Sequence, residues 1–441
     1  MGKAVDAVRV GLLGLGTVGA GTVNVLRRNA DEIARRAGRG IRVVRAAVRD
    51  PGRARSCDLA GISVTGDPGS VIGASDVDVI VELIGGIEPA LELVHAAIEH
   101  GKHVVTANKA LIALHGNEVF SHAQRRGAMV AFEAAVAGGI PVIKAIREGL
   151  SGNRIAWLAG IINGTGNFIL SEMQSAGREF AEVLAEAQAL GYAEADPTYD
   201  IEGIDAAHKL AILASIAFGN PLQFDRVFTE GISHLNADDI RYAAQLGYRI
   251  KHLGIAKRSE RGIEMRVHPA LIPARQVIAN VDGVLNAVLV QGDAVGPTLY
   301  SGAGAGAEPT ASAVVADLVD VVRMLTSDPE NRVPHLAFQP QALGDERIVP
   351  MEEVVTGYYL RMLAEDRPGV LAEVSGILAR EWISIEAMVQ REPREETHVD
   401  LVMLTHPVEE GQMNRALQAI GGLSAIRGPV MRVRVETLDN D

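Results

Sequence analysis

Apolar segments of strand-like length alternate with helical segments through the N-terminal third of the chain, and no other feature limits the possible folds as strongly. The strand-like segments are 7–14, 41–48, 77–84, 103–109 and 128–136, and the helical segments between them include 17–37 and 88–101. Apolar strands separated by helices form βαβ units, which assemble into a parallel sheet. The sequence therefore predicts an α/β domain here.

The pattern changes twice further along the chain. Between about 140 and 300, strand-like segments such as 154–163 and 252–258 are mixed with long helices, which predicts an α+β domain. A clear helix follows at 308–327, and the segment 328–352 has four prolines and little periodicity, so we expect a linker there.

The C-terminal tail has the clearest periodicity. Its elements are expected at 357–365 (strand), 370–381 (helix), 383–392 (strand), 398–406 (strand), 409–422 (helix) and 429–436 (strand). This βαββαβ order is ferredoxin-like.

Composition and charge exclude several function classes. With 55 acidic against 42 basic residues the formal net charge is −13, whereas non-specific nucleic-acid binding needs a basic surface. The one cysteine, Cys57, can form neither an intrachain disulfide nor a cysteine cluster for zinc. No segment resembles a signal peptide or a membrane span, so we expect a cytoplasmic protein without membrane partners.

The sequence "GLGTVG" follows the first strand and opens the first helix. In a G-x-G-x-x-G turn, Gly14 permits the tight turn, Gly16 lets the backbone approach a pyrophosphate, and Gly19 allows close helix–strand packing. Thr17 and Val18 begin the helix whose N-terminus would face the phosphates. The motif predicts a Rossmann dinucleotide site, and a glycine-rich turn without a ligand is the alternative.

The second strand ends in "AAVRD", which bears on the choice between NAD and NADP. A carboxylate here usually binds the ribose of NAD, whereas arginine accommodates the 2′-phosphate of NADP. Both Arg49 and Asp50 are present and Arg53 follows. We favour NADP, with solvated loop arginines as the alternative.

Three further segments are expected beside the cofactor. "ELIGG" (82–86) and "TANK" (106–109) end two strands, and ligands of an open parallel sheet bind beyond the carboxyl ends of its strands. This favours a site role for Thr106 and Lys109. The "GAGAG" segment, with Gly304 and Gly306, either closes over the nicotinamide or substrate or serves as a flexible hinge.

Five carboxylates gather where a helix begins, in "GYAEADPTYDIEGIDAAHKL". They are Glu194, Asp196, Asp200, Glu202 and Asp205. Asp205 and Lys209 stand four residues apart, so both project from one helical face. A solvated pair of this spacing is worth only about 0.3–0.5 kcal/mol. The apolar run after Lys209 indicates a buried helix, however, where an idle ion pair would be costly.

These motifs together resemble homoserine dehydrogenase. "GLGTVG", "TANK", "EAAVAGGIP", "INGTGNFI", "GYAEADPTYDIEGIDAAHK" and "GAGAG" with "PTASAVVADL" occur in that family's order, over about residues 5 to 330. The tail, with "EDRPGVL" (365–371), looks like an ACT domain. The resemblance implies a dinucleotide-binding domain at 1–137, completed by the helix 308–327; a catalytic, substrate and dimerisation domain at 138–307; the linker 328–352; and an ACT regulatory domain at 353–441.

The family's reaction is the reversible reduction of L-aspartate 4-semialdehyde to L-homoserine with NAD(P)H. The resemblance implies that Lys209 and Asp205 are catalytic and that Lys109 is a second site lysine. It implies substrate binding by Glu194, Asp205, Gly191 and Thr165. It also implies a monovalent-cation site, such as one for sodium, made by Glu133 and the carbonyl groups of Val136, Gly138 and Ile140.

The predicted chemistry needs a lysine. Hydride addition to an aldehyde leaves negative charge on oxygen, which needs a proton and a positive neighbour. A lysine has a reference pKa of about 10.4, and burial or a second cation would lower it into a useful range. No histidine stands near Cys57 in the sequence, which weighs against a cysteine nucleophile. His95, His100 and His103 match no metal motif and are expected at the surface and in turns.

Regulation and assembly follow from the tail. We expect the "EDRPG" turn to bind a small amino acid, L-threonine as the pathway end product, with a ligand-free dimerisation unit as the alternative. A homodimer or homotetramer is expected. Two rival functions stay open: another Rossmann oxidoreductase of a small amino aldehyde, and a catalytically inactive amino-acid sensor.

Overall fold

The structure, a computed structural model, describes residues 6–329, 332–390 and 398–438. The chain forms two compact units. Unit 1 comprises Met1–Leu158, His208–Asp225 and Val284–Glu346, and unit 2 comprises Ala159–Ala207, Arg226–Gly283 and Arg347–Asp441. None of the helices in the described part of the chain has the length and apolar character to cross a membrane.

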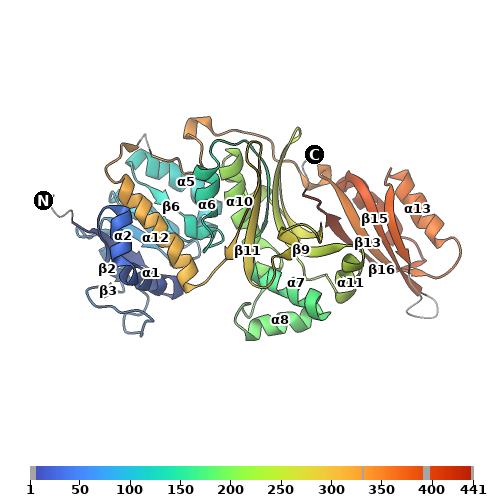
Figure 1. Ribbon diagram of the computed structural model, residues 1–441, viewed down its shortest axis with the longest axis horizontal. Coiled ribbons are helices and arrows are strands. Elements are labelled where there is room, and N and C mark those ends of the chain that lie inside the picture. The colour runs from blue at the N-terminus through green and yellow to red at the C-terminus, as the bar shows by residue number, and fades with distance from the viewer. Residues whose placement is uncertain (1–5, 330–331, 391–397, 439–441) are drawn as a thin grey trace. The chain divides into compact units, whose positions relative to one another are not determined.

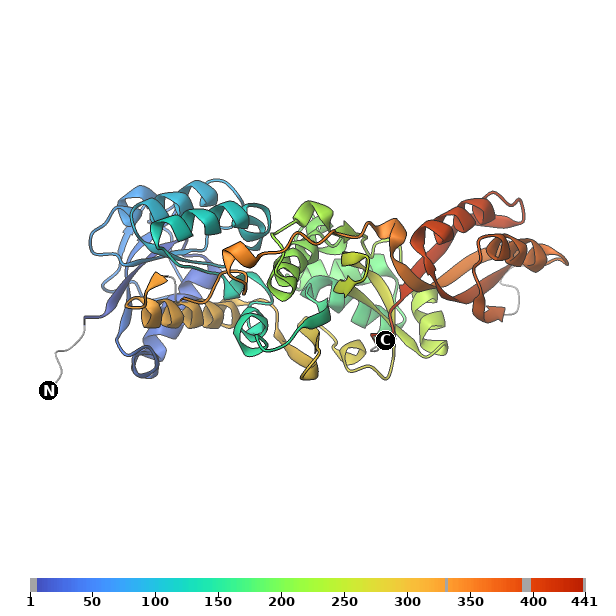
Figure 2. The same ribbon diagram turned by 90° about the horizontal axis from the view of Figure 1, so that it is seen from above.

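Unit 1 contains a six-stranded parallel sheet of order β3-β2-β1-β4-β5-β6. Its strands are β1 (Val8–Leu13), β2 (Ile41–Ala47), β3 (Ser63–Thr65), β4 (Val79–Glu82), β5 (His103–Thr106) and β6 (Val130–Ala131). The central strands are buried on both faces because helices cover each of them (Figures 1 and 2). The predicted parallel α/β sheet is confirmed.

The helices of this sheet are α1 (Thr17–Arg28), α2 (Ala30–Ala37), α3 (Pro68–Ile72), α4 (Ala90–Glu99), α5 (Lys109–Arg126) and α12 (Ala307–Met324). The predicted single helix 17–37 is two helices, because the backbone leaves the helical conformation at Asn29. Helix α12 packs against α1, as expected for a helix that completes this domain. A Cβ atom at Gly21 would lie 2.5 Å from the carbonyl oxygen of Ala307, so the two helices approach closely there.

Strand β6 is much shorter than the predicted strand 128–136. The chain turns after Ala131 into a 3-10 helix, η1 (Glu133–Ala135), followed by α6 (Val142–Lys144) and the π-helix η2 (Ala145–Gly149). The predicted linker covers this edge of the sheet. His335 Nε2 accepts a hydrogen bond from the Val130 N–H at 3.2 Å, and its ring stacks on Phe120. An edge strand is thereby shielded from further pairing.

Unit 1 also holds the hairpin of β11 (Leu285–Gly292) and β12 (Gly296–Ala303). Strand β7 (Ile155–Ile161) and helix α10 (Ile204–Phe218) begin in one unit and end in the other along the chain.

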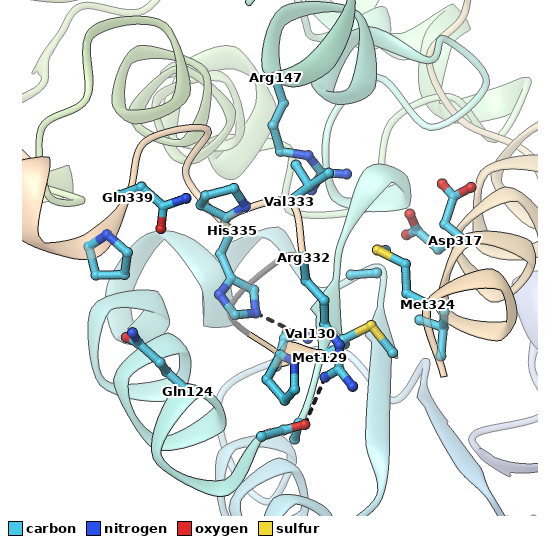
Figure 3. Close-up of a pocket in the computed structure, with 18 of the residues that line it drawn as sticks. Gln124, Met129, Val130, Arg147, Asp317, Met324, Arg332, Val333, His335 and Gln339 are labelled. Carbon is cyan, nitrogen blue, oxygen red and sulfur yellow. Dashed lines mark hydrogen bonds between the residues drawn. The ribbon is translucent and has the colours of Figure 1, made fainter. Parts of the chain in front are cut away.

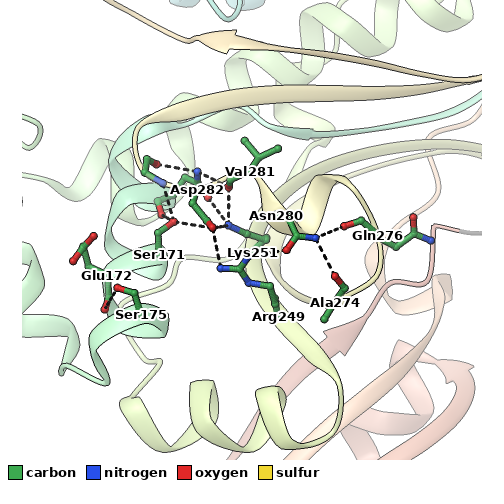
Figure 4. A network of polar contacts seen from close by, with 12 residues as sticks. Ser171, Glu172, Ser175, Arg249, Lys251, Ala274, Gln276, Asn280, Val281 and Asp282 are labelled. Carbon is green, nitrogen blue, oxygen red and sulfur yellow. Dashed lines mark hydrogen bonds and ion pairs between the residues drawn. The ribbon is translucent and has the colours of Figure 1, made fainter.

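Unit 2 combines part of the α+β region with the C-terminal module. Its first part contains α7 (Gly164–Ala176), α8 (Phe180–Ala189), α9 (Thr198–Ile201), β8 (Phe228–Thr229), α11 (Ala237–Gln245), β9 (Tyr248–Ser259) and β10 (Gly262–Pro273). Buried Lys251 on β9 bonds to Asn167 of α7 and to Asp282, with Nζ to Asp282 Oδ1 at 2.8 Å (Figure 4). This network fastens α7 to the strand.

The C-terminal module consists of β13 (Val355–Glu365), α13 (Val370–Arg380), β14 (Ile385–Gln390), β15 (His398–Glu409), α14 (Glu410–Gly421) and β16 (Ile426–Val435). Its strand order, β16-β13-β15-β14, is that of a ferredoxin-like sheet, so the predicted βαββαβ fold is confirmed. The end of the predicted strand 383–392 lies outside the described residues. The domain boundaries proposed from the sequence stay predictions.

The two faces of this small sheet belong to different cores. Tyr358, Leu360 and Met362 on β13 pack with residues of α13 and α14. The intervening Tyr359 packs instead with residues of α7, α8 and α11. Because successive side chains of a strand point to opposite faces, the module shares a core with the rest of unit 2.

Candidate functional site

The glycine-rich turn after β1 has the geometry that a dinucleotide site needs. Gly14 has φ +101°, and a Cβ atom there would lie 2.7 Å from the Leu83 carbonyl oxygen. A Cβ atom at Gly19 would lie 2.5 Å from the Gly14 carbonyl oxygen, so both positions require glycine for packing. A Cβ atom at Gly16 would contact nothing within 4 Å. The protein itself therefore gives no steric reason for glycine at position 16.

The N-terminus of α1 can accept an anion. Gly16 is its N-cap and supplies no side-chain hydrogen bond, and the first turn contains no acidic residue. Thr17 is exposed and Val18 is half-buried. The first backbone N–H groups of this helix and the positive end of its dipole suit a phosphate. The residues present thus fit a pyrophosphate.

The loop after β2 holds the residues expected to distinguish NADP from NAD. Arg49, Asp50 and Arg53 are all exposed. Asp50 Oδ1 accepts a hydrogen bond from the Gly52 N–H at 2.9 Å, and Arg55 Nη2 donates to the Asp50 carbonyl at 2.7 Å. One carboxylate oxygen of Asp50 is therefore used within the turn.

A buried polar network joins the ends of β4 and β5. Glu82 is fully buried, and its Oε2 accepts a hydrogen bond from Thr106 Oγ1 at 2.6 Å. The Ile84 N–H donates to Glu82 Oε1 at 2.7 Å, and Asn108 Nδ2 donates to the Gly86 carbonyl at 2.6 Å. These bonds fix both strand ends, beyond which the cofactor of such a sheet binds.

The same network positions the start of α5. The Asn108 N–H donates to Thr106 Oγ1 at 3.0 Å, and Asn108 Oδ1 caps the helix by accepting from the Leu111 N–H at 3.1 Å. Lys109 is the first residue of α5 and is half-buried. The Thr106 hydroxyl is engaged on both sides, so a cofactor contact at this residue would be made by its backbone.

The second glycine-rich segment enters α12. Gly306 is the N-cap, at φ +127°, and provides no side-chain cap. Gly304 faces Asn286 so closely that a Cβ atom would collide with its side-chain amide. The Gly139 N–H donates to the Ala303 carbonyl at 3.0 Å, which ties the segment to 138–139.

The predicted substrate residues of unit 2 lie on α7 and on the loop after α8. Gly191 follows the C-cap of α8 with φ +76°, and Glu194 is exposed on the loop. Thr165 is buried near the start of α7, and its hydroxyl donates to the Tyr192 carbonyl at 2.7 Å. Thr165 therefore holds the loop that carries Glu194.

One asparagine donates hydrogen bonds to two of the five carboxylates. Asn163 Nδ2 donates to Asp200 Oδ1 at 2.7 Å and to Asp205 Oδ2 at 2.9 Å. Its Oδ1 accepts from the Gly166 N–H at 2.7 Å and caps α7. Asp205 is 3% exposed, so this acid is held in place at the start of α10.

The remaining carboxylates shape the loop. Asp196 Oδ1 accepts from the Thr198 N–H at 3.1 Å, and hydrogen bonds from Thr198 lower the pKa of Asp196. Glu202 Oε1 accepts from Ser233 Oγ at 2.7 Å. Lys209 follows Asp205 by one turn on α10 and is 9% exposed. The prediction that α10 is a buried helix is confirmed.

The predicted cation residues surround the turn after β6. Both oxygens of Glu133 accept backbone hydrogen bonds, from the Ile143 N–H at 2.9 Å and the Lys144 N–H at 2.8 Å. The Ile140 carbonyl accepts from the Val142 N–H, and the Gly138 backbone packs against Thr310. Within the described ranges, no group of three His, Cys, Asp or Glu side chains is arranged to hold a metal ion.

Two buried acids adjoin one another at this turn. The Glu133 N–H donates to Asp317 Oδ2 at 2.8 Å. Burial raises the pKa of Glu133 to about 7, and burial together with the Glu133 charge raises the pKa of Asp317 to about 8. A bound cation would favour the ionised form of either acid.

A cavity of about 500 Å³ lies beside β6, within unit 1 (Figure 3). Its lining includes Arg147, Asp317, Arg332 and His335, while none of the site residues predicted from the sequence lines it. Burial and the nearby charge of Arg147 lower the pKa of His335 to about 4, so this histidine stays neutral and keeps accepting the bond that covers β6.

The histidines and the cysteine have ordinary roles. His95 Nδ1 contacts His122 Nδ1 at 2.7 Å between α4 and α5, His100 ends α4, and His103 Nδ1 accepts from the Met129 N–H. Burial raises the pKa of the Cys57 thiol, which disfavours the thiolate that a cysteine nucleophile requires.

Glu82, Asn108 and Asn163 are the polar residues at these positions that the sequence prediction missed. A signal was present for each of them. Glu82 is an acid at the end of an apolar strand, and each asparagine stands immediately before a helix, where asparagine commonly caps.

Comparison with known protein families agrees with this arrangement. Residues 14–133 match a family model described as "Homoserine dehydrogenase, NAD binding domain", residues 141–319 match "Homoserine dehydrogenase", and residues 358–424 match "ACT domain". Together with the Rossmann sheet and its glycine-rich turn, these matches define a nicotinamide-nucleotide-dependent oxidoreductase with a C-terminal ACT domain.

Full-length relatives are more specific. A homoserine dehydrogenase of Pseudomonas aeruginosa is 65% identical over 433 residues, which covers 98% of this chain and 99% of the relative. One from Neisseria gonorrhoeae is 54% identical over 431 residues, again 98% and 99% of the two chains. The chain belongs to the homoserine dehydrogenase family.

Solved structures show the same fold. The homoserine dehydrogenase of Thiobacillus denitrificans has a TM-score of 0.94 at 64% identity, covering 98% of this chain and 99% of that one. A hyperthermophilic archaeal homoserine dehydrogenase in complex with NADPH has a TM-score of 0.61 at 25% identity, covering 71% of this chain and 97% of that one. The predicted fold class, family and NAD(P)-dependent oxidoreductase activity are confirmed.

The buried acids give a testable pH dependence. Asp317 has a folded pKa of about 8, above the unfolded value of about 3.9, so the folded state keeps its proton longer than the unfolded chain. The contribution of Asp317 to the free energy of unfolding is complete below about pH 4 and is lost as the pH rises towards 8. We expect Asp317→Asn to reduce the fall in melting temperature between pH 6 and pH 8.

The control for this prediction lies on the same helix. Exposed Glu308 bonds to Arg28, and this bond lowers the pKa of Glu308. The contribution of Glu308 to the free energy of unfolding therefore does not change between pH 6 and pH 8. Glu308→Gln should keep the wild-type difference between the two melting temperatures. Equal differences in the wild type and Asp317→Asn would contradict the burial argument.

Proposed function

We propose that Lys209 is the acid–base residue for the interconversion of L-aspartate 4-semialdehyde and L-homoserine. One observation carries this assignment: α10 bears buried Lys209 one turn after buried Asp205, whose carboxylate Asn163 holds. A buried lysine and a buried aspartate at this spacing would be costly in a helix without a function.

The roles follow from the charge that develops. When bound, the nicotinamide nucleotide supplies the hydride. The Lys209 ammonium donates a proton to the carbonyl oxygen as negative charge builds there, and takes it back from the alcohol in the reverse direction. Lys109, at the start of α5, adds a second positive charge that favours the oxyanion.

The α-ammonium group of the substrate requires negatively charged partners. Glu194 and Asp205 bind its α-ammonium in this proposal. The Thr165 hydroxyl holds the loop through Tyr192, and Gly191, with its positive φ, lets the loop leave α8. Exposed Glu194 is accessible to a ligand, whereas Asp205 is fixed by Asn163.

We propose NADP as the preferred cofactor. Gly14, Gly16, Thr17, Val18 and Gly19 fit its pyrophosphate. The support for its 2′-phosphate comes from Arg49, because one oxygen of the competing Asp50 carboxylate is already bonded to the Gly52 N–H. The backbones of Thr106, Gly304 and Gly306 and the side chain of Lys109 complete the proposed cofactor set.

A monovalent cation such as sodium is proposed near Glu133. Each Glu133 oxygen accepts one backbone hydrogen bond, at 2.9 and 2.8 Å, and keeps a lone pair. The carbonyl groups of Val136, Gly138 and Ile140 follow on the same segment. Oxygen donors of this kind suit a hard cation.

The ACT domain is proposed to bind L-threonine as an inhibitor. Gly369 at φ +98° is the N-cap of α13 and supplies no side-chain cap, which leaves the helix amides for a carboxylate. Asp366 is exposed on the same turn and suits the effector's ammonium. A homodimer or homotetramer and a cytoplasmic location remain predictions.

The family match favours an active homoserine dehydrogenase over an inactive amino-acid sensor. The presence of Lys109, Asp205 and Lys209 together speaks against it, because a scaffold without catalysis has no use for this set. Consumption of NADPH on addition of aspartate semialdehyde separates the two, and other small amino aldehydes in the same assay test the substrate class.

Lys209→Ala should retain less than about a tenth of the wild-type turnover, because a positioned general acid contributes about 10²–10⁴ in rate. Turnover is measured as NADPH consumption at saturating semialdehyde. Lys102→Ala is the control, since Lys102 lies on the turn before β5 and donates to the Ala74 carbonyl. Turnover of Lys209→Ala above a tenth of wild type would rule out this role.

Asp366→Ala should weaken inhibition by L-threonine at least about tenfold and leave kcat unchanged, because loss of a charged ligand contact costs about 1.5–3 kcal/mol. Inhibition curves measure the effect. Glu386→Ala, an exposed acid on β14, is the matched control. A wild type that millimolar threonine does not inhibit would refute this effector, and an unaltered curve for Asp366→Ala would refute the site.

A further inference from the structure

The last strand of the ACT module continues into the catalytic sheet. Strand β16 pairs antiparallel with β13 of the module and parallel with β10, through Ala270–Arg434 and Leu271–Val435. The Glu436 N–H also donates to the Leu271 carbonyl at 2.9 Å. The C-terminal end of the module is therefore built into the sheet of unit 2.

A buried ion network occupies this junction. The Arg434 side chain is fully buried, with Nε bonded to Glu410 Oε2 at 2.9 Å and Nη1 to Glu230 Oε2 at 3.0 Å. Tyr358 donates to Glu410, and Arg432 Nη2 donates to Glu230 Oε2 at 3.3 Å. Glu230, which precedes the module by more than a hundred residues, is thus the shared partner of two arginines on β16.

Glu230 lies on the segment that supports the carboxylate loop. Its N–H donates to the Val267 carbonyl at 2.8 Å, directly after β8. Two residues later, the Ile232 N–H donates to the Ile201 carbonyl at 2.9 Å, and Ser233 Oγ donates to Glu202 Oε1 at 2.7 Å. The segment 230–233 and residues 201–202 are therefore bonded through both backbone and side chain.

The contact between segment 230–233 and residues 201–203 is tightly packed. A Cβ atom at Gly231 would lie 2.8 Å from the Cα of Glu202, so the two backbones touch. A Cβ atom at Gly203 would lie 3.0 Å from Val267 and 3.1 Å from Thr229 and His252 side-chain atoms. A displacement of the segment after β8 must move the backbone of residues 201–203.

Asn163 holds the loop 200–205 from the side opposite segment 230–233. It holds Asp200 and Asp205, which flank the residues that the segment 230–233 contacts. Arg434 is consequently separated from Asp205 only by Glu230, its segment and the short loop 200–205.

A second ionic contact of the module leads elsewhere and provides the control. Arg361 Nε on β13 bonds to Asp239 Oδ1 at 2.6 Å, and Asp239 also accepts from the Tyr359 hydroxyl at 3.2 Å. Asp239 belongs to α11 and bonds to Asn236 at the start of that helix as well as to Arg361 and Tyr359, rather than to the carboxylate loop, within the described residues.

From these contacts we infer that Glu230 is a positioning residue that makes the last ACT strand a support of the substrate loop. The inference rests on the proposed function, in which that loop binds homoserine. Glu230 acts through residues 201–205 and does not touch the reacting atoms. A change in the ACT module that moves β16 reaches the substrate carboxylates through the contacts of Glu230 with Arg434 and Arg432.

Glu230→Gln in the full-length enzyme tests the inference. The variant keeps the shape of the side chain and removes the charge that Arg434 and Arg432 share. We expect backbone amides of 198–205 to exchange hydrogen at least about tenfold faster, which is about 1.4 kcal/mol of lost protection. The KM for homoserine should rise at least about fivefold while kcat stays within about twofold, because binding geometry and not chemistry is altered.

Asp239→Asn is the matched control, because it removes the acid of the other ionic contact that the module makes. It should leave both the exchange of 198–205 and the KM for homoserine at wild-type values. Glu230→Asp, which restores the charge, should recover at least part of the exchange protection.

The outcomes separate the inference from the function on which it rests. Exchange in 198–205 that is no faster in Glu230→Gln than in Asp239→Asn would overturn the inference, whatever the activity. Faster exchange with an unchanged KM would uphold the structural connection and overturn the assignment of homoserine binding to this loop. Faster exchange with a raised KM supports both.

Discussion

The side-chain amide of Asn163 is the contact on which the predicted substrate region depends. Its two N–H bonds hold Asp200 and Asp205 together, and its oxygen caps α7. Two carboxylates at close range repel one another, and a neutral amide holds them without cancelling their charge. The loop therefore holds two carboxylates in a fixed arrangement, and α10 starts from a fixed point with Lys209 one turn further on.

The ACT module and the proposed substrate loop belong to the same compact unit. Tyr359 on one face of its sheet packs with α7, α8 and α11, while Tyr358 on the other packs with the module's own helices. The fully buried side chain of Arg434 joins Glu410 of the module to Glu230, which lies beside the proposed substrate loop. Breaking one side of such a buried pair is strongly destabilising, so the two parts are held in one arrangement.

Much of the fold and of the candidate site follows from sequence pattern. The alternation of strands and helices predicted the parallel sheet, "GLGTVG" predicted the nucleotide turn, and the tail predicted the ferredoxin-like order. Local pattern could not predict contacts between distant residues, such as Thr106 with Glu82. It also overextended the strand at 128–136, because Glu133 turns inward to cap α6 and leaves β6 with two residues. The position of the linker could not be predicted either. The hydrogen bond between the Val130 N–H and His335 forms only once β6 stands at the edge of the sheet.

The central claim is that Asn163 fixes Asp205, which is proposed to bind the substrate. Steady-state kinetics of Asn163→Ala with homoserine, combined with direct measurement of NADP binding, test it most directly. The account predicts a fall in kcat/KM for homoserine of at least about a hundredfold, or about 2.7 kcal/mol, with an unchanged Kd for NADP. A kcat/KM within about twofold of the wild type would contradict it.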